Sequence, residues 1–254
     1  RHHRALGAVG MYLALTGTSI GPHDALQFGF ATHFVDASKV DELCDELCKV
    51  SATKQANALE ILLRRFSSPP PLDVQYDRSV RRWQKEIELC FGADKLDVDA
   101  VLCSLQEPSG NGAEATEWRK SVLSLLSAKS PLSLEVSFAL IRNFNASTLD
   151  AELEKCLTLD RHMLDESDFL EGVRAVLIEK TKNALWQKET RCSLRGRVRS
   201  WIEEADANVL APQPTSSAYG TRERQVYNHW QDMSDFCCYG CSPDSGLKLA
   251  IFAQ

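Results

Sequence analysis

The stretch Leu15–Leu43 constrains the fold most, because it places two glycines and a proline where helices end and begin. Gly17 follows an apolar run, and a residue just past a helix end often needs the positive φ that glycine adopts without strain. Pro22 suits the first turn of a second helix, over roughly Pro22–Phe28, where a missing N–H would have no partner in any case. Gly29 ends that helix in the same way.

A short strand and further helices are expected on either side of these turns. Apolar residues at helical spacing predict a helix over Arg4–Thr16 and another through Val50, and Thr32–Val35 is predicted to be extended. Ser38 is the expected N-cap of the later helix, since serine oxygens accept hydrogen bonds from the free amides of a first turn.

The chain from Ala52 onward reads as a succession of helices. Apolar residues recur every three to four positions, with breaks at Ser67–Pro71 and Glu107–Gly112. The predicted helical segments lie within 59–66, 80–91, 96–105, 118–126, 131–141, 148–164, 168–180 and 201–208. Asp94 and Ser130 are the expected N-caps of two of them, and Pro131 suits a first-turn position. The trio Asp160–His162 is expected to form a solvated face.

Composition excludes several classes of protein. The chain has 254 residues, 44% of them hydrophobic and 25% charged, as in a globular protein that buries a core. A net charge of −6 argues against nucleic-acid binding, which normally requires a basic patch. No apolar run approaches the roughly 18 residues of a membrane span. The nine cysteines, mostly spread through helical segments, favour reduced thiols in an intracellular compartment.

Two cysteine patterns could bind a metal. Cys44 and Cys48 lie four residues apart on one predicted helix, but a structural zinc site needs four ligands, so buried or half-buried free thiols are favoured. Cys238 and Cys241 form a single C-x-x-C near His229 without a second pair. No metal site is therefore predicted, with zinc at the second pattern as the alternative.

Two ordered motifs resemble the enoyl-CoA hydratase/isomerase (crotonase) superfamily. The first motif matches at Leu13, Leu15, Thr16, Gly17, Ile20, Ala25, Gly29 and Val35. Within it Ala31–Val35 (ATHFV) is similar to the 3-hydroxyisobutyryl-CoA hydrolase branch, as is Asp168–Lys180 (DFLEGVRAVLIEK) with Trp186 beyond it. The helical insertion of about 95 residues after Val35 also resembles that branch. The resemblance covers about Gly7 to Trp186.

The resemblance implies the C-terminal portion of an α/β crotonase-like protein (ClpP/crotonase spiral fold), mostly α-helical here with one or two short strands. Residues 1–36 would be the end of the core and 37–187 the helical C-terminal part. Residues 188–254 match nothing in the family and are expected to be a poorly ordered tail or a gene-model artefact. A helix face should remain uncovered where the sheet would pack.

The implied activity is hydrolysis of 3-hydroxyisobutyryl-CoA to 3-hydroxyisobutyrate and CoA, in mitochondrial valine catabolism. Such a reaction needs two backbone N–H groups to stabilise the oxyanion and a carboxylate to activate water. In this branch a Glu and an Asp precede a Gly-Gly run, yet the sequence contains no Gly-Gly pair. No catalytic residue is therefore expected within the chain; by order the motifs would precede Arg1, and the chain alone should be inactive.

Lys180 is the one residue that the resemblance assigns to ligand binding. The equivalent helix of related hydratases brings a lysine and an aromatic residue to the adenine end of CoA, and Lys180 falls within one residue of that lysine. Val176 occupies the position of the aromatic residue, so stacking should be missing. The alternative is a terminal helix with a basic end.

Three functions remain open at this point. The first is the thioester hydrolase, acting on a small acyl-CoA with no cofactor beyond the CoA of its substrate. The second is a non-catalytic relative that keeps the helical half as an interaction or assembly surface. The third is an enoyl-CoA hydratase or isomerase. Neither nucleic acid nor a membrane is an expected partner, and the oligomeric state is open.

Overall fold

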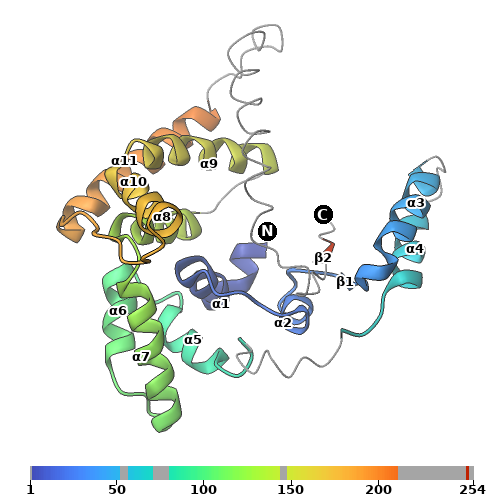
Figure 1. Ribbon diagram of the computed structural model, residues 1–254, viewed down its shortest axis with the longest axis horizontal. Coiled ribbons are helices and arrows are strands. Elements are labelled where there is room, and N and C mark those ends of the chain that lie inside the picture. Colours follow the sequence, from blue (N-terminus) through green and yellow to red (C-terminus); the bar gives the residue numbers. More distant parts are fainter. Residues whose placement is uncertain (1, 52–56, 71–79, 144–147, 211–249, 252–254) are drawn as a thin grey trace, which may run out of the picture. The chain divides into compact units, whose positions relative to one another are not determined.

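The computed structural model describes residues 2–51, 57–70, 80–143, 148–210 and 250–251, and it divides the chain into two compact units (Figure 1). The first unit comprises residues 1–29 and 73–210, and the second comprises residues 30–72 and 211–254. Both units are described separately below. Helices account for most of the described residues, as the sequence predicts. None of these helices is long and apolar enough to cross a bilayer.

One part of the first unit packs around helix α1 (Figure 1). Its members are α1 (His2–Thr16), α5 (Gln84–Phe91), α6 (Val98–Gln106), α7 (Ala113–Ser127) and α8 (Pro131–Arg142). α1 contacts α5, α7 and α8 directly. The shared core contains Leu15, Ile87, Val101, Leu126 and Phe138, all with exposed fractions of 6% or less.

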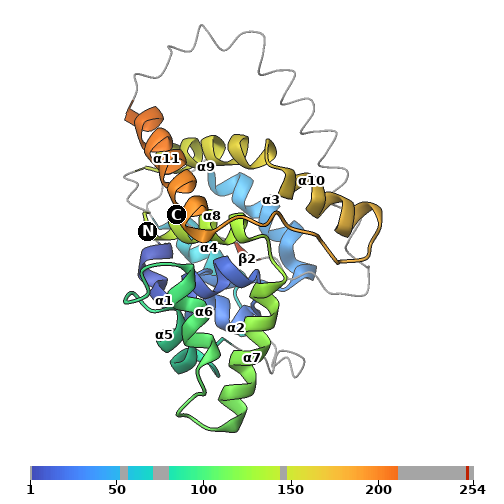
Figure 2. The same ribbon diagram turned by 90° about the vertical axis from the view of Figure 1, so that its left-hand side faces the viewer.

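Helix α8 also belongs to a second core, which it forms with α9 (Leu149–Leu164) and α11 (Arg191–Leu210). Leu134 and Phe138 of α8 face the first core, whereas Leu132 and Val136 face the second. A displacement of two residues turns a side chain by about 200° around a helix, so one helix can serve both cores. α9 and α11 lie side by side in both views (Figure 2).

Helix α11 is longer than the predicted segment at residues 201–208, since it begins at Arg191. Its buried side chains Leu194, Val198, Trp201 and Ala205 follow the spacing of one helical face. The arginines between them obscure this face in the sequence. In the structure two of those arginines, Arg195 and Arg197, pair with the carboxylates of Asp97 and Glu166.

The turns predicted within Leu15–Leu43 are confirmed. α1 ends at Thr16, and Gly17 follows with φ of +65° while its N–H donates to the Leu13 carbonyl at 2.9 Å. α2 (Pro22–Gln27) has Pro22 in its first turn. The Asp24 side chain of α2 is buried, and its Oδ2 accepts the backbone N–H of Val80 at 2.7 Å. This hydrogen bond ties α2 to the chain that enters α5.

Helix capping follows the sequence in part. Ser130 caps α8 as predicted, since its Oγ accepts the Ser133 N–H at 3.2 Å. The predicted cap at Asp94 is wrong, because Asp97 caps α6. The predicted cap at Ser38 is also wrong: Asp36 accepts the Ser38 N–H and hydroxyl and begins a 3-10 turn, η1 (Ala37–Lys39). In both cases an aspartate two or three residues from the predicted position accepts the backbone N–H of the first turn instead.

The second unit contains a two-stranded antiparallel sheet and a helical hairpin. β1 (His33–Phe34) pairs with β2 (Ala250–Ile251), which confirms the predicted extended piece. α3 (Val40–Ser51) packs on α4 (Ala58–Phe66). The buried residues Val35, Leu43, Leu62, Leu63 and Phe66 form the hydrophobic cluster of this unit.

Helix α9 exposes much of its apolar side. Leu149, Leu153, Leu157 and Leu164 keep 43–63% of their surface exposed, while Leu159 faces the second core. The expectation that Asp160–His162 is simply solvated is wrong for His162, whose ring stacks on Trp201 with centroids 4.8 Å apart.

Candidate functional site

A groove of about 720 Å³ opens in the first unit where α10 (Ser167–Val173) passes into the π-helical turn η3 (Arg174–Ile178). The ends of α7 and α9, the start of α8 and the chain after η3 complete its walls, and we call it the α10 groove. Its apolar lining includes Leu125, Phe169, Val176, Leu177 and Trp186. Its charged lining includes Lys129, Lys182 and Asp168. The groove therefore offers an apolar surface with lysines along it.

The chain after η3 folds back and forms one wall of this groove. The Lys182 N–H donates to the Ala175 carbonyl at 3.0 Å. Trp186 Nε1–H donates to the Ala128 carbonyl at 3.0 Å, at the end of α7. Buried Asp168 accepts the Gln187 N–H at 2.9 Å and the Ser130 hydroxyl at 2.6 Å. Side-chain and backbone hydrogen bonds thus hold the chain after η3 in place, although this segment forms no helix or strand.

Glu171 adds a further attachment point on α10. Its carboxylate pairs with both Nε and Nη2 of Arg174, at 2.7 and 2.6 Å, and accepts the Leu185 N–H at 2.6 Å. The hydrogen bonds from Arg174 and from the Leu185 backbone lower the pKa of Glu171 to about 2. Glu171 is therefore ionised at neutral pH and acts as an anchor of the returning chain.

Lys180 lies at the start of the returning chain, with φ of +56° and an exposed side chain. It does not line the α10 groove, whereas Lys182 does. Val176 stands where related hydratases carry an aromatic residue. Two aromatic side chains from other positions, Phe169 and Trp186, line the groove instead. Sequence reasoning missed Lys182 as a lining residue, since the turn at Lys180 and Lys182, both with positive φ, leaves no periodic signal.

Replacement of Trp186 by Phe should test this wall of the groove. A smaller aromatic ring remains, but the hydrogen bond from Nε1 to the Ala128 carbonyl is lost. We expect the free energy of unfolding to fall by about 1 kcal/mol, the usual net contribution of one such bond. Urea unfolding of the two proteins measures the difference, and an unchanged midpoint would mean that the bond contributes nothing.

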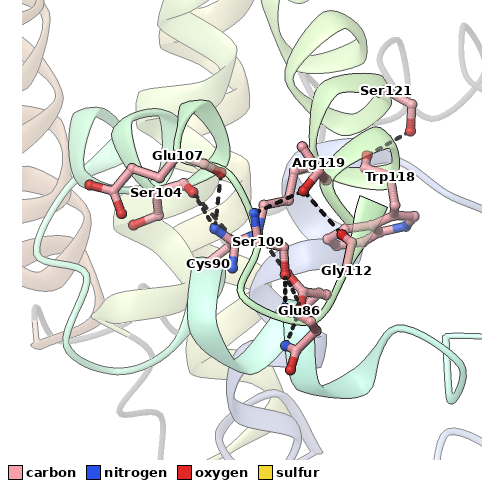
Figure 3. A network of polar contacts seen from close by, with 11 residues as sticks. Glu86, Cys90, Ser104, Glu107, Ser109, Gly112, Trp118, Arg119 and Ser121 are labelled. Carbon is pink, nitrogen blue, oxygen red and sulfur yellow. Dashed lines mark hydrogen bonds and ion pairs between the residues drawn. The ribbon is translucent and has the colours of Figure 1, made fainter. Parts of the chain in front are cut away.

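A buried network in the same unit joins α5, α6 and α7 (Figure 3). Arg119 Nε donates to Glu86 Oε2 at 2.6 Å, and its Nη1 donates to the carbonyls of Ser104 and Glu107 at 3.1 and 3.2 Å. Ser109 and Asn111 donate to the other oxygen of Glu86. Burial raises the pKa of Glu86, but hydrogen bonds from three side chains outweigh burial and lower it overall. Each oxygen of this carboxylate is satisfied, so the network is a structural clamp.

The described residues contain no assembled nucleophile or metal centre. Cys90 is fully buried, and burial raises the pKa of its thiol to about 11, so it stays protonated. Within this part of the chain no three His, Cys, Asp or Glu side chains gather as metal ligands. Cys44 and Cys48 are exposed, which contradicts the expectation that they are buried. Cys238, Cys241 and His229 lie outside the described residues.

Comparison with known sequences decides the family. The sequence profile of the enoyl-CoA hydratase/isomerase family matches residues 2–198. The chain belongs to this family. The match runs through all the helices of the first unit up to α11 and continues past Trp186, where the resemblance was expected to end.

Individual relatives support the branch that the sequence motifs indicate. The mitochondrial 3-hydroxyisobutyryl-CoA hydrolase of Xenopus tropicalis is 29% identical over 193 residues, which cover 73% of this chain and 46% of the relative. The small ribosomal subunit protein mS47 of Schizosaccharomyces pombe is 32% identical over 188 residues, covering 73% of this chain and 42% of the relative. The predicted resemblance to the hydrolase branch is confirmed. The chain spans less than half the length of these two relatives.

A solved structure confirms the fold class. The enoyl-CoA hydratase from Rhodobacter sphaeroides 2.4.1 superposes with a TM-score of 0.56 and 23% identity, over 84% of this chain and 54% of that chain. The chain thus has the fold of part of a crotonase-like protein. The division predicted at residues 36 and 187 stays a prediction.

Proposed function

We propose that this chain is the helical part of an acyl-CoA thioester hydrolase resembling 3-hydroxyisobutyryl-CoA hydrolase. The reaction would convert 3-hydroxyisobutyryl-CoA and water to 3-hydroxyisobutyrate and CoA, in mitochondria, as a step of valine breakdown. The observation that carries the proposal is the similarity to a mitochondrial hydrolase of that name over 193 residues. The motifs ATHFV and Asp168–Lys180 support the same branch.

No catalytic group of the proposed enzyme is assigned among the 254 residues. No Gly-Gly pair occurs in the sequence, and the polar clusters of the first unit, at Glu86 and Asp168, are taken up by structural hydrogen bonds. The role proposed for this chain is therefore to bind and position the substrate. No cofactor is proposed beyond the CoA of the substrate.

Lys180 is proposed to contact the CoA part of the substrate. Its side chain is exposed beside the α10 groove, whose lining already includes Lys182. A solvent-exposed ammonium paired with a phosphate contributes little affinity, about 0.2–1 kcal/mol, in line with other exposed ion pairs. Loss of Lys180 should therefore weaken CoA binding modestly and leave the chemical step unchanged.

Release of free CoA thiol tests the proposed activity. The 254-residue chain should release no thiol from 3-hydroxyisobutyryl-CoA above the buffer rate, whereas an extended protein that also carries the Glu, the Asp and the Gly-Gly run of this branch should release it. In the extended protein Lys180→Ala should raise KM by roughly twofold to fivefold at constant kcat. The matched control Lys188→Ala should leave both constants unchanged. Water addition to an enoyl-CoA without thiol release would replace the hydrolase by a hydratase.

A non-catalytic assembly role is the second candidate. It is favoured by the 32% identity to the small ribosomal subunit protein mS47 over 188 residues. An exposed apolar face on α9, formed by Leu149, Leu153 and Leu157, would suit such a role. Sedimentation separates the two: an assembly protein comigrates with small ribosomal subunits on a sucrose gradient, and a soluble hydrolase stays at the top.

A further inference from the structure

Helix α3 of the second unit carries two free cysteines on one exposed stripe. Cys44 and Cys48 lie four residues apart, and both side chains are exposed. Leu43, by contrast, is fully buried, and Leu47 packs against the hydrophobic cluster that α3 shares with α4. Each cysteine follows one of these leucines by one position, which is about 100° around the helix. The two leucines therefore fix the rotation of α3 and turn both thiols away from the core.

The spacing of the two cysteines brings both sulfur atoms within reach of one metal ion. Side chains four residues apart on a helix have their Cβ atoms about 5–6 Å apart. A bond between a metal ion and a thiolate is about 2.3 Å long, so two bonds on opposite sides of one ion place the sulfur atoms about 4.6 Å apart. Rotation about χ1 of each cysteine bridges this small difference, and the helix backbone need not move.

The number of ligands at this position decides between metals. Within the part of the chain that the structure describes, no third His, Cys, Asp or Glu side chain joins the pair as a ligand. Zinc in structural sites takes four ligands, so two cysteines are too few for a zinc centre. Thiolates are soft ligands that select Cu(I), and this ion is satisfied by two sulfur atoms in a line.

The charge of α3 also favours a cation. The helix is negatively charged, since one lysine stands against four carboxylates: Lys49, with Asp41, Glu42, Asp45 and Glu46. The lysine is paired with the last of these, because its Nζ lies 2.6 Å from Glu46 Oε1. A negatively charged surface raises the local concentration of cations and lowers that of anions.

We propose that Cys44 and Cys48 bind one Cu(I) ion through their two sulfur atoms. Each thiol gives its proton to solvent as its sulfur forms a bond to the ion. One Cu(I) thus replaces two protons, and its oxidation state does not change. The site belongs to the second unit and uses no residue of the α10 groove, so it stands or falls independently of the proposed hydrolase.

Anaerobic titration of the full chain against the Cu(I) complex of bicinchoninate tests the proposal. The wild type should take one more equivalent of Cu(I) from this chelator than the double variant Cys44→Ser/Cys48→Ser. Each single substitution should cause the whole of that loss, because one remaining thiol leaves the ion with a single protein ligand. A loss divided between the two single variants would show two independent thiols. No loss in the double variant would place Cu(I) elsewhere, and either result would overturn the proposal.

Controls separate this pair from the other cysteines of the chain. Cys103→Ser removes an exposed thiol of α6 and should leave the uptake unchanged. In a chain that carries Cys238→Ser and Cys241→Ser, the difference of one equivalent should persist. Because Cys44 and Cys48 are exposed, circular dichroism should show wild-type helix content in their serine variants. Excess zinc should not displace the ion, since zinc needs four ligands, and displacement would contradict a site of two cysteines.

Discussion

Replacement of Arg119 by Met is expected to lower the free energy of unfolding by about 3–5 kcal/mol. The substitution keeps much of the side-chain volume but leaves the Glu86 carboxylate, 3% exposed, without its cation. The carbonyls of Ser104 and Glu107 lose their donor as well. Because a domain is typically stable by only about 5–15 kcal/mol, this loss approaches the whole margin.

Urea unfolding of Arg119→Met beside Lys120→Met measures this effect. Lys120 is the next residue on α7, but it is exposed and its Nζ lies 3.7 Å from a carboxylate oxygen of Glu117, so its loss should cost at most about 0.5 kcal/mol.

The difference in free energy of unfolding between Arg119→Met and the wild type should also become smaller in acid. The lowered pKa of Glu86 stabilises the fold above the ordinary carboxyl pKa of 4.5, and that stabilisation is lost as pH falls through the folded pKa. Equal effects of the two substitutions would show that the clamp contributes nothing.

Local signals in the sequence predicted much of the helical framework. Gly17 predicted a helix end and Pro22 a helix start, and the structure has both. These signals are local, because glycine readily adopts a positive φ and proline fixes φ near the helical value. Ser130 was identified as a cap for the same local reason. Asp36 and Asp97 were missed because several polar residues precede each helix, and only the backbone geometry selects which side chain accepts the amide.

The α10 groove depends on contacts between distant residues, which a single sequence does not reveal. Trp186 donates to a carbonyl 58 positions earlier. Lys180 was identified through a family resemblance, yet Lys182 lines the groove. The periodicity of α9 identified an apolar side at Leu153 and Leu157 but did not indicate that this side is exposed.

The second large effect is expected from Asp168→Ala, which removes the anchor of the returning chain. Asp168 is 6% exposed and accepts hydrogen bonds from the Ser130 hydroxyl and the Gln187 N–H. Hydrogen bonds to a charged group contribute about 1.5–3 kcal/mol each, and Gln187 is exposed whereas Ser130 is buried, so we expect a loss of about 2–4 kcal/mol.

The loss should be largest locally, because Asp168 joins the start of α8 to the wall of the α10 groove. Limited trypsin digestion should cleave Asp168→Ala after Lys180 and Lys182 faster than the wild type, since segments attached by fewer hydrogen bonds open more often. Asp165→Ala, at an exposed residue just after α9, is the matched control and should be cleaved at the wild-type rate. If cleavage at these lysines is equally fast in all three proteins, Glu171 and Trp186 hold the returning chain without Asp168. In that case the α10 groove keeps its wall, and the modest KM effect expected for Lys180→Ala would be unaltered by the Asp168 substitution.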